Sequence, residues 1–78
     1  SALAEQPGIN PAWLLDLGRH AITDADGTVR VSGAEILARV VREQAGDANG
    51  AEARALLQPL QQDGDHRVVA AALNGLQP

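Results

Sequence analysis

Residues 23–35, TDADGTVRVSGAE, decide the fold of this chain, because they separate two stretches with helical apolar spacing. The stretch begins with an acidic turn, in which aspartates and a glycine favour a reversal of the chain. Val29 and Val31 then alternate with polar residues, which predicts a short extended piece around them. Ser32, with Glu35 three positions later, matches the capping box that opens a helix. The stretch therefore predicts a turn, a brief extended segment and a new helix.

The rest of the chain carries helix start and stop signals. Asn10 and Pro11 are typical of a helix start, as the cap and the first helical residue. Asn49, with a glutamate three residues on, predicts another start. Pro59 predicts an end or a kink just before it, and Asp65 suits the cap of the last helix. The sequence predicts an all-α fold of four short helices, at about residues 10–22, 33–45, 50–62 and 66–75.

The core available to these helices is small and aliphatic. Of the 35 hydrophobic residues 15 are alanine, and Phe, Tyr, Met and Cys are absent. Trp13, the single large aromatic residue, is expected to fill the core, with an interface position as the alternative. The last helix is expected to bury Val68 and Leu73. Because so small a core lies near the balance between burial and chain entropy, docking to a partner or self-association is expected.

The domain organisation predicted from the sequence is simple. Residues 1–8 are small and polar and are predicted to be a flexible N-terminal segment, while residues 9–78 form a single helical domain. The chain begins at Ser1 without methionine or a signal-like segment. We therefore expect a processed chain or a domain of a larger protein, with a cytoplasmic location as the default.

Charge and side-chain inventory argue against several function classes. The net charge is −4, with six arginines and no lysine, whereas nonspecific nucleic-acid binding depends on neutralising phosphates. No apolar run approaches the roughly 20 residues of a membrane span. With no Cys, Lys or Tyr and only two His, no nucleophile with its base is evident. The sequence predicts a protein that is not an enzyme and that binds neither nucleic acid nor a membrane.

The central stretch resembles an EF-hand calcium loop with its flanking helices, over about residues 13–45. Oxygen-bearing side chains alternate along it, and a glutamate at the start of the next helix would close the site. The sixth loop position, which is normally glycine, is Val29. The resemblance implies calcium as the ligand, and otherwise no cofactor is expected. The metal ligands that it implies are Asp24, Asp26, Thr28 and Glu35.

A second resemblance, to HEAT-type helical repeats, involves the same stretch. Residues 24–37 are similar to the inter-helix turn and second helix of one repeat, and residues 56–72 to those of another. The acidic turns at 24–26 and 63–65 lie 39 positions apart. Duplication or two independent helix starts would explain this spacing, and independent starts are favoured because such caps are generic. The resemblance implies a protein-binding hairpin scaffold in which a helix already begins near Asp26.

Interaction with another protein is the function that the sequence favours. The chain is expected to be a small acidic docking or accessory module that buries a helical apolar face against a partner, or against a second copy as a homodimer. A single-site calcium-binding module is the runner-up. The sequence leaves open which apolar faces are core and which are free. The residues from which an interaction face would be drawn are Trp13, Leu14, Leu17, Val40, Val41, Leu57 and Leu60.

Overall fold

The computed structural model describes residues 10–77, which fold into four α-helices and one 3₁₀ helix. The α-helices are α2 (Pro11–Ala21), α3 (Gly27–Glu43), α4 (Ala48–Leu57) and α5 (His66–Leu76), with the 3₁₀ helix η1 (Gln58–Gln62) between the last two. Within residues 10–77 there is no strand, and the predicted all-α class with four helices is confirmed. Residues 1–8, for which a flexible segment is predicted, lie outside the described residues.

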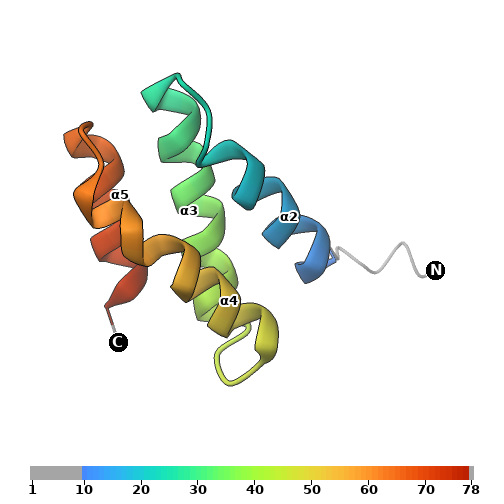
Figure 1. The fold of residues 1–78 in the computed structure, drawn as a ribbon. Coiled ribbons are helices and arrows are strands. Elements are labelled where there is room, and N and C mark those ends of the chain that lie inside the picture. Colours follow the sequence, from blue (N-terminus) through green and yellow to red (C-terminus); the bar gives the residue numbers. More distant parts are fainter. Residues whose placement is uncertain (1–9, 78) are drawn as a thin grey trace.

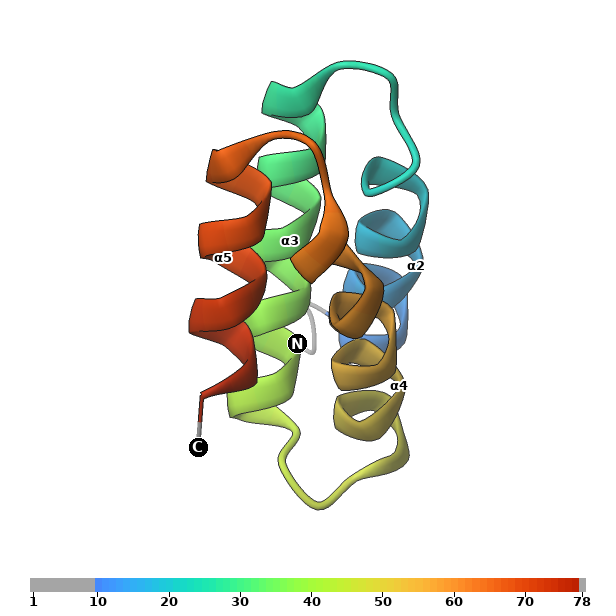
Figure 2. The ribbon, with the colours of Figure 1, turned by 60° about the vertical axis from the view of Figure 1, so that its left-hand side comes forward.

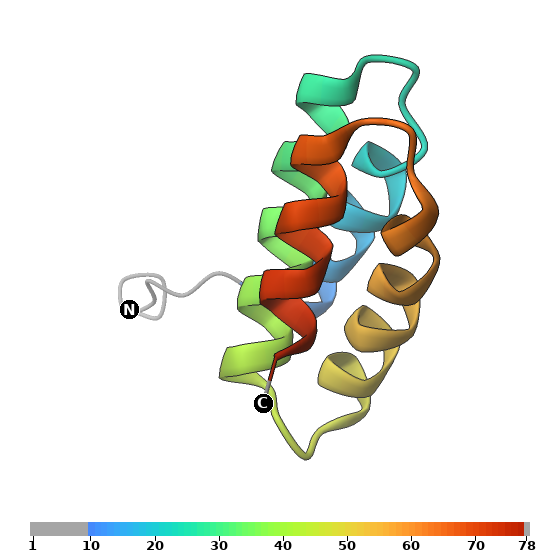
Figure 3. The same cartoon turned by 90° about the vertical axis from the view of Figure 1, so that its left-hand side faces the viewer.

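The helices form two hairpins that stack side by side (Figure 1). Hairpin 1 consists of α2 and α3, and hairpin 2 consists of α4 with η1, followed by α5. Figure 2 shows α3 and α5 alongside each other in one layer, with α2 and α4 in the other. The turns that precede α3 and α5 lie at the same end of the molecule, and the α3–α4 loop lies at the opposite end (Figure 3). Hairpin 2 thus repeats the course of hairpin 1.

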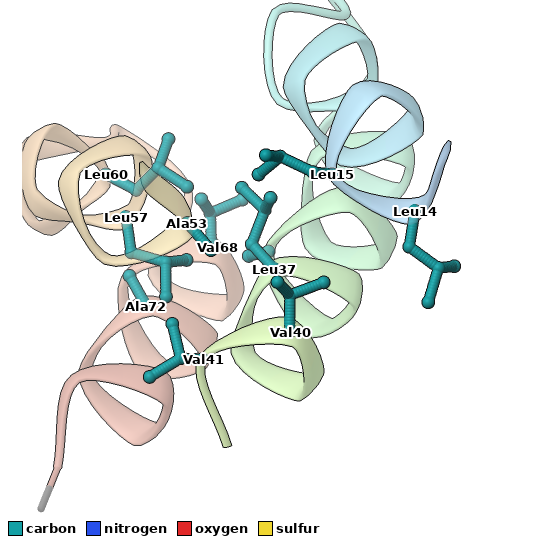
Figure 4. Packing of buried hydrophobic residues seen from close by; sticks show 11 residues of the cluster. Leu14, Leu15, Leu37, Val40, Val41, Ala53, Leu57, Leu60, Val68 and Ala72 are labelled. Carbon is teal, nitrogen blue, oxygen red and sulfur yellow. The ribbon is translucent and has the colours of Figure 1, made fainter. Parts of the chain in front are cut away.

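Helix α3 is the centre of the molecule, because it packs against each of the other three α-helices. The largest fully buried side chains are Leu37 and Val40 of α3, Leu57 of α4 and Val68 of α5. Burying a side chain of this size contributes roughly 1.5–3 kcal/mol. Figure 4 shows these four side chains gathered between the helices, whereas Leu14 lies apart from them. The core cluster comprises Leu14, Leu15, Ala34, Leu37, Val40, Val41, Ala53, Leu57, Leu60, Val68 and Ala72.

Two glycines allow helices to rest directly on α3. A Cβ atom on Gly33 of α3 would lie 2.7 Å from the Cβ of Ala21 in α2. A Cβ atom on Gly75 of α5 would lie 2.7 Å from the Cβ of Ala38 in α3. Both separations are well inside van der Waals contact, so any larger residue would push the helices apart. Close approach of this kind compensates for the small side chains in the core.

Helix α3 begins well before the predicted start, which lies just after Ser32. The cap is Asp26, whose Oδ1 accepts a hydrogen bond from the Thr28 backbone N–H at 2.8 Å. The predicted extended piece around Val29 and Val31 is therefore wrong, and Ser32 is an exposed residue inside the helix rather than its cap. Two cap signals compete here. A start at Asp26 adds more than one turn of backbone hydrogen bonds compared with a start at Ser32, and this gain outweighs the weak β preference of the two valines.

The other helix ends follow local signals closely. Asn10 caps α2 and Asp65 caps α5, as predicted. Helix α4 ends shortly before Pro59 and continues as the 3₁₀ helix, as predicted for a proline at this point. The predicted start of α4 is wrong by two residues, because Asp47 accepts from the Asn49 backbone N–H at 2.8 Å and is the cap. Aspartate here outcompetes a following asparagine.

Four large apolar residues between residues 10 and 77 are exposed. Trp13 is 58 % exposed, Leu17 41 %, Val29 36 % and Leu73 45 %. The predictions that Trp13 fills the core and that Leu73 is buried are therefore wrong. On α2 the inward stripe is centred on Leu15 and Gly18, because Gly18 lets α3 approach closely on that side. The bulky tryptophan is left on the opposite side of the helix.

Candidate functional site

In the acidic turn before α3, two aspartate side chains accept hydrogen bonds from nearby backbone N–H groups. Asp24 Oδ1 accepts from the Asp26 backbone N–H at 2.8 Å, and Asp26 in turn caps the helix through the Thr28 N–H. Each of these two carboxylates thus holds the backbone two residues further on. This is the pattern by which aspartate forms a turn and ends it in a helix start.

Arg30, on the first turn of α3, joins this turn to the turn of hairpin 2. Its Nη1 donates to the backbone oxygens of Asp24 at 2.8 Å and Ala25 at 2.9 Å. Its Nε and Nη2 donate to the two carboxylate oxygens of Asp63, at 3.0 and 3.2 Å. The Asp63 side chain is only 10 % exposed. A bidentate pair of this kind fixes both direction and distance between the turns.

The electrostatics of Asp63 follow from this contact. The hydrogen bond from Arg30, and next the one from the Asp65 backbone N–H, hold the pKa of the Asp63 carboxyl below its ordinary value. The same pair raises the pKa of the Arg30 guanidinium. Because both hydrogen bonds favour the charged carboxylate, the link between the turns is an ion pair at neutral pH.

The turn before α5 repeats the first turn with an offset of 39 residues. Asp63 Oδ1 accepts from the Asp65 N–H at 2.8 Å, and Asp65 Oδ1 accepts from the Arg67 N–H at 2.9 Å. Arg67 also pairs with the Asp65 carboxylate, Nη2 to Oδ2 at 2.8 Å, and donates to Thr28 Oγ1 at 3.4 Å. The side-chain contact from Arg67, followed by its backbone N–H, lowers the pKa of Asp65 to about 2. Asp24, Asp26 and Thr28 are thus the counterparts of Asp63, Asp65 and Arg67.

The two turns touch, and a glycine makes room for the contact. A Cβ atom on Gly27 would collide with the carboxylate of Asp65. Gly27, the first residue of α3, is therefore in direct contact with Asp65, the cap of α5. The sequence offered only the 39-residue spacing as a sign of this contact, and the Arg30–Asp63 pair was not predicted.

The four residues implied as calcium ligands are not brought together. Asp24 and Asp26 lie in the turn and hold backbone N–H groups, and Thr28 lies in the first turn of α3. Glu35 is exposed on α3, eight residues after Gly27, which corresponds to about 12 Å along a helix axis. Residues 10–77 contain no group of three or more His, Cys, Asp or Glu side chains arranged to hold a metal ion. Calcium binding by this segment stays a prediction.

The residues proposed for an interaction face divide into two groups. Trp13 and Leu17 lie on the surface of α2. The other five are in the core cluster and are no more than 9 % exposed; they are Leu14, Val40, Val41, Leu57 and Leu60. Val29, at 36 % exposed, and Leu73 are further exposed apolar residues that the predicted interaction face did not include.

Trp13, Leu17 and Val29 lie on the side of hairpin 1 that faces away from hairpin 2, here called the outer face. Arg19 marks the side of α2 toward α4, because it pairs with Glu52. Leu17 precedes it by two residues, about 200° around the helix, and Trp13 lies one turn before Leu17. On α3, Val29 is nine residues from Ala38, which meets α5; this separation is two and a half turns. The outer face therefore carries three exposed apolar side chains along the length of hairpin 1.

A cavity of about 490 Å³ lies at the opposite end of the molecule, around the α3–α4 loop. Its two charged side chains are already engaged, since Asp47 caps α4 and Arg54 Nη1 donates to the Leu76 backbone oxygen at 3.4 Å. The lining residues are Val41, Ala45, Gly46, Asp47, Ala48, Gly50, Ala51 and Arg54. The cavity is mostly backbone and alanine and brings no nucleophile and base together.

None of the helices between residues 10 and 77 has the length and apolar character that crossing a bilayer requires. No protein-family model matches the chain, and neither a curated protein nor a solved structure matches it.

Proposed function

We propose that this chain is a protein-interaction module made of two stacked helical repeats, which docks through the outer face of hairpin 1. The proposal fits the HEAT-type resemblance, in which short helical hairpins stack into a scaffold for binding partners. It makes the chain a docking or accessory part of a larger protein or assembly.

The observation that carries the proposal is the different burial of two equivalent valines. Val68 at the start of α5 is fully buried in the core cluster, to which both hairpins contribute. Its counterpart 39 residues earlier, Val29 at the start of α3, is 36 % exposed. The position is apolar in both hairpins, but only one of them has a neighbour on that side. The exposure of Val29, at a position that is buried in hairpin 2, supports the docking of a partner on this side of hairpin 1.

Trp13 and Leu17 extend the same argument along α2. A tryptophan that is 58 % exposed leaves a large apolar surface in water, and Trp is one of the residue types enriched at the energetic centres of interfaces. A Leu17 that is 41 % exposed lies one helical turn away. Together with Val29 they give a partner three anchors on a rigid face.

Rigidity of this face supports docking as the mechanism. Arg30 hydrogen-bonds both the backbone of the first turn and the Asp63 carboxylate. Gly33 and Gly75 let α2 and α5 pack closely against α3. Because the hairpins are held in one arrangement, little conformational entropy is lost when a partner covers the outer face.

Site-specific photo-crosslinking tests the proposal. A photoreactive amino acid replaces Leu17 in the chain expressed in its native cells, and the matched control carries it at Ala55, an exposed position on α4. We expect one polypeptide, or the same chain, to be captured from position 17 and not from position 55. Equal labelling from both positions, or none from position 17 in a folded chain, would refute docking through this face.

A further inference from the structure

The two ends of the stack differ, because only hairpin 1 carries an arginine that forms an ion pair with the turn of the other hairpin. Arg30 binds the Asp63 carboxylate with two hydrogen bonds. The residue 39 positions after Arg30 is Val69, which is half-buried and has no charge to offer. Asp63 of hairpin 2 therefore pairs with an arginine of hairpin 1, but hairpin 2 has no arginine at the equivalent position to pair with a further hairpin.

Asp24, in the turn of hairpin 1, is the counterpart of Asp63 in the turn of hairpin 2. Both aspartates use Oδ1 to accept from the backbone N–H two residues on, at 2.8 Å. In Asp63, Oδ2 accepts from Arg30 Nε. Within residues 10–77, Asp24 is exposed and takes part in no ion pair. The two turns thus have the same geometry, but among the described residues no arginine pairs with the Asp24 carboxylate as Arg30 pairs with that of Asp63.

We infer that the outer face of hairpin 1 binds another two-helix hairpin, which gives an arginine to Asp24 and covers Val29. The inference rests on the proposed function and names the partner: a helical hairpin whose second helix starts after an Asp-x-Asp turn and carries an arginine at the position of Arg30. The interface between hairpins 1 and 2 is the template for this contact. It already combines an apolar strip with one bidentate arginine–carboxylate pair at the turn.

The same geometry makes the stack directional. If a second copy of this chain docked its hairpin 2 on the outer face, Val69 would lie opposite Asp24. That contact would leave the carboxylate beside an apolar side chain, which is unfavourable unless a donor is supplied. Wild-type copies therefore do not assemble head to tail, and the partner is a different hairpin.

A pair of variants tests the inference by supplying the missing arginine. The donor chain is V69R/D24N, which offers an arginine but cannot receive one, and the acceptor is the wild type. The D24N substitution keeps a side-chain oxygen for the Asp26 N–H and so preserves the turn. By sedimentation equilibrium, each chain alone is expected to be monomeric and the mixture to contain a 1:1 complex. A mixture that stays monomeric would overturn the inference.

Two controls separate a specific contact from charge alone. An L73R/D24N donor places the arginine elsewhere on α5 and is expected to form no complex. Replacing the acceptor by D24N is expected to weaken the complex by at least roughly tenfold, as for loss of one member of a close charge pair. An equally tight complex in either control would contradict the assigned contact.

A tandem chain covers the case in which far-UV circular dichroism shows that V69R/D24N is unfolded. Two copies are joined end to end; the first carries V69R, and the second either keeps Asp24 or carries D24N. A higher thermal midpoint for the tandem chain that keeps Asp24 is expected, and equal midpoints would refute the contact. If these tests fail while residue 17 still captures a partner, docking stands and only the nature of the partner is wrong.

Discussion

The start of α3 gives a sharp test of the structure, because two residues compete as its cap. In the structure Asp26 accepts from the Thr28 backbone N–H at 2.8 Å, and its carbonyl oxygen accepts from the Arg30 N–H at 3.1 Å. Ser32 is exposed in the middle of the same helix. The substitutions D26A and S32A should therefore have opposite effects on the free energy of unfolding.

The expected sizes follow from the two positions. Removing a helix cap costs about 1 kcal/mol, within a range of roughly 0.5–2 kcal/mol. For a domain of this length that corresponds to a fall in the thermal midpoint of about 4–8 °C. In S32A, alanine replaces a residue of lower helix propensity at an exposed helical position, so the stability should rise by at most about 0.5 kcal/mol.

Thermal and urea unfolding followed by far-UV circular dichroism measure both variants. D26N is the matched control, because asparagine caps as well as aspartate does and only the charge is lost. We expect D26N to stay close to the wild type. A loss of about 1 kcal/mol in S32A with little change in D26A would place the helix start at Ser32 and refute the stacked turns.

Three further predictions address the turn, the packing and the ion. The pKa of Asp65 lies at about 2 against an ordinary value of 3.8, so the ionised carboxylate stabilises the folded state above pH 3.8, and this contribution is lost as the pH falls toward 2. The thermal midpoint should therefore drop less between pH 3.8 and pH 2 in D65N than in the wild type. G75A should destabilise the protein, since the new Cβ would lie 2.7 Å from that of Ala38, whereas G64A, with open space around it, should have little effect in urea titrations. Millimolar calcium should leave the thermal midpoint unchanged, because residues 24–35 form no ligand set; a rise with calcium concentration would reveal a site by mass action.

Features that depend on a few neighbouring residues were predictable from the sequence. The caps Asn10 and Asp65 and the helix end before Pro59 are local effects of side-chain oxygens and of a missing N–H. The predicted start of α3 after Ser32 was wrong, and the start near Asp26 was expected only from the resemblance to helical repeats, because Asp26 and Ser32 are both good caps. The choice between them depends on packing along the whole helix, which periodicity alone does not weigh.

The exposed residues show a different limit of sequence reasoning. Trp13 and Leu17 lie one helical turn apart on one side of α2, and Leu14 and Leu15 are neighbours on another side, so the spacing alone does not say which side faces α3. Gly18 decides, because a Cβ there would lie 2.7 Å from the Leu37 side chain. Close helix contact at a glycine is a property of the pair of helices and not of either one.

The contact between the turns was partly visible in advance. The 39-residue spacing of the two acidic turns is in the sequence, but it was attributed to two independent helix starts rather than to duplication. The structure adds that the turns touch and that Arg30 reaches across 33 residues to Asp63. A charge pair over such a separation depends on the stacking of the hairpins, so no local pattern predicts it.

The most direct test of the stacked hairpins is a double-mutant cycle on the Arg30–Asp63 pair. R30Q and D63N each remove one member, and D63N keeps a side-chain oxygen for the Asp65 N–H, so the turn itself survives. Urea unfolding of the wild type, both single variants and the double variant gives the coupling between the two side chains. We predict that each single variant is destabilised, and R30Q more than D63N, because R30Q also loses the hydrogen bonds to the Asp24 and Ala25 backbone oxygens. The double variant should be hardly less stable than R30Q. Additive losses, with no coupling between residues 30 and 63, would contradict the claim that this pair holds the two hairpins in register.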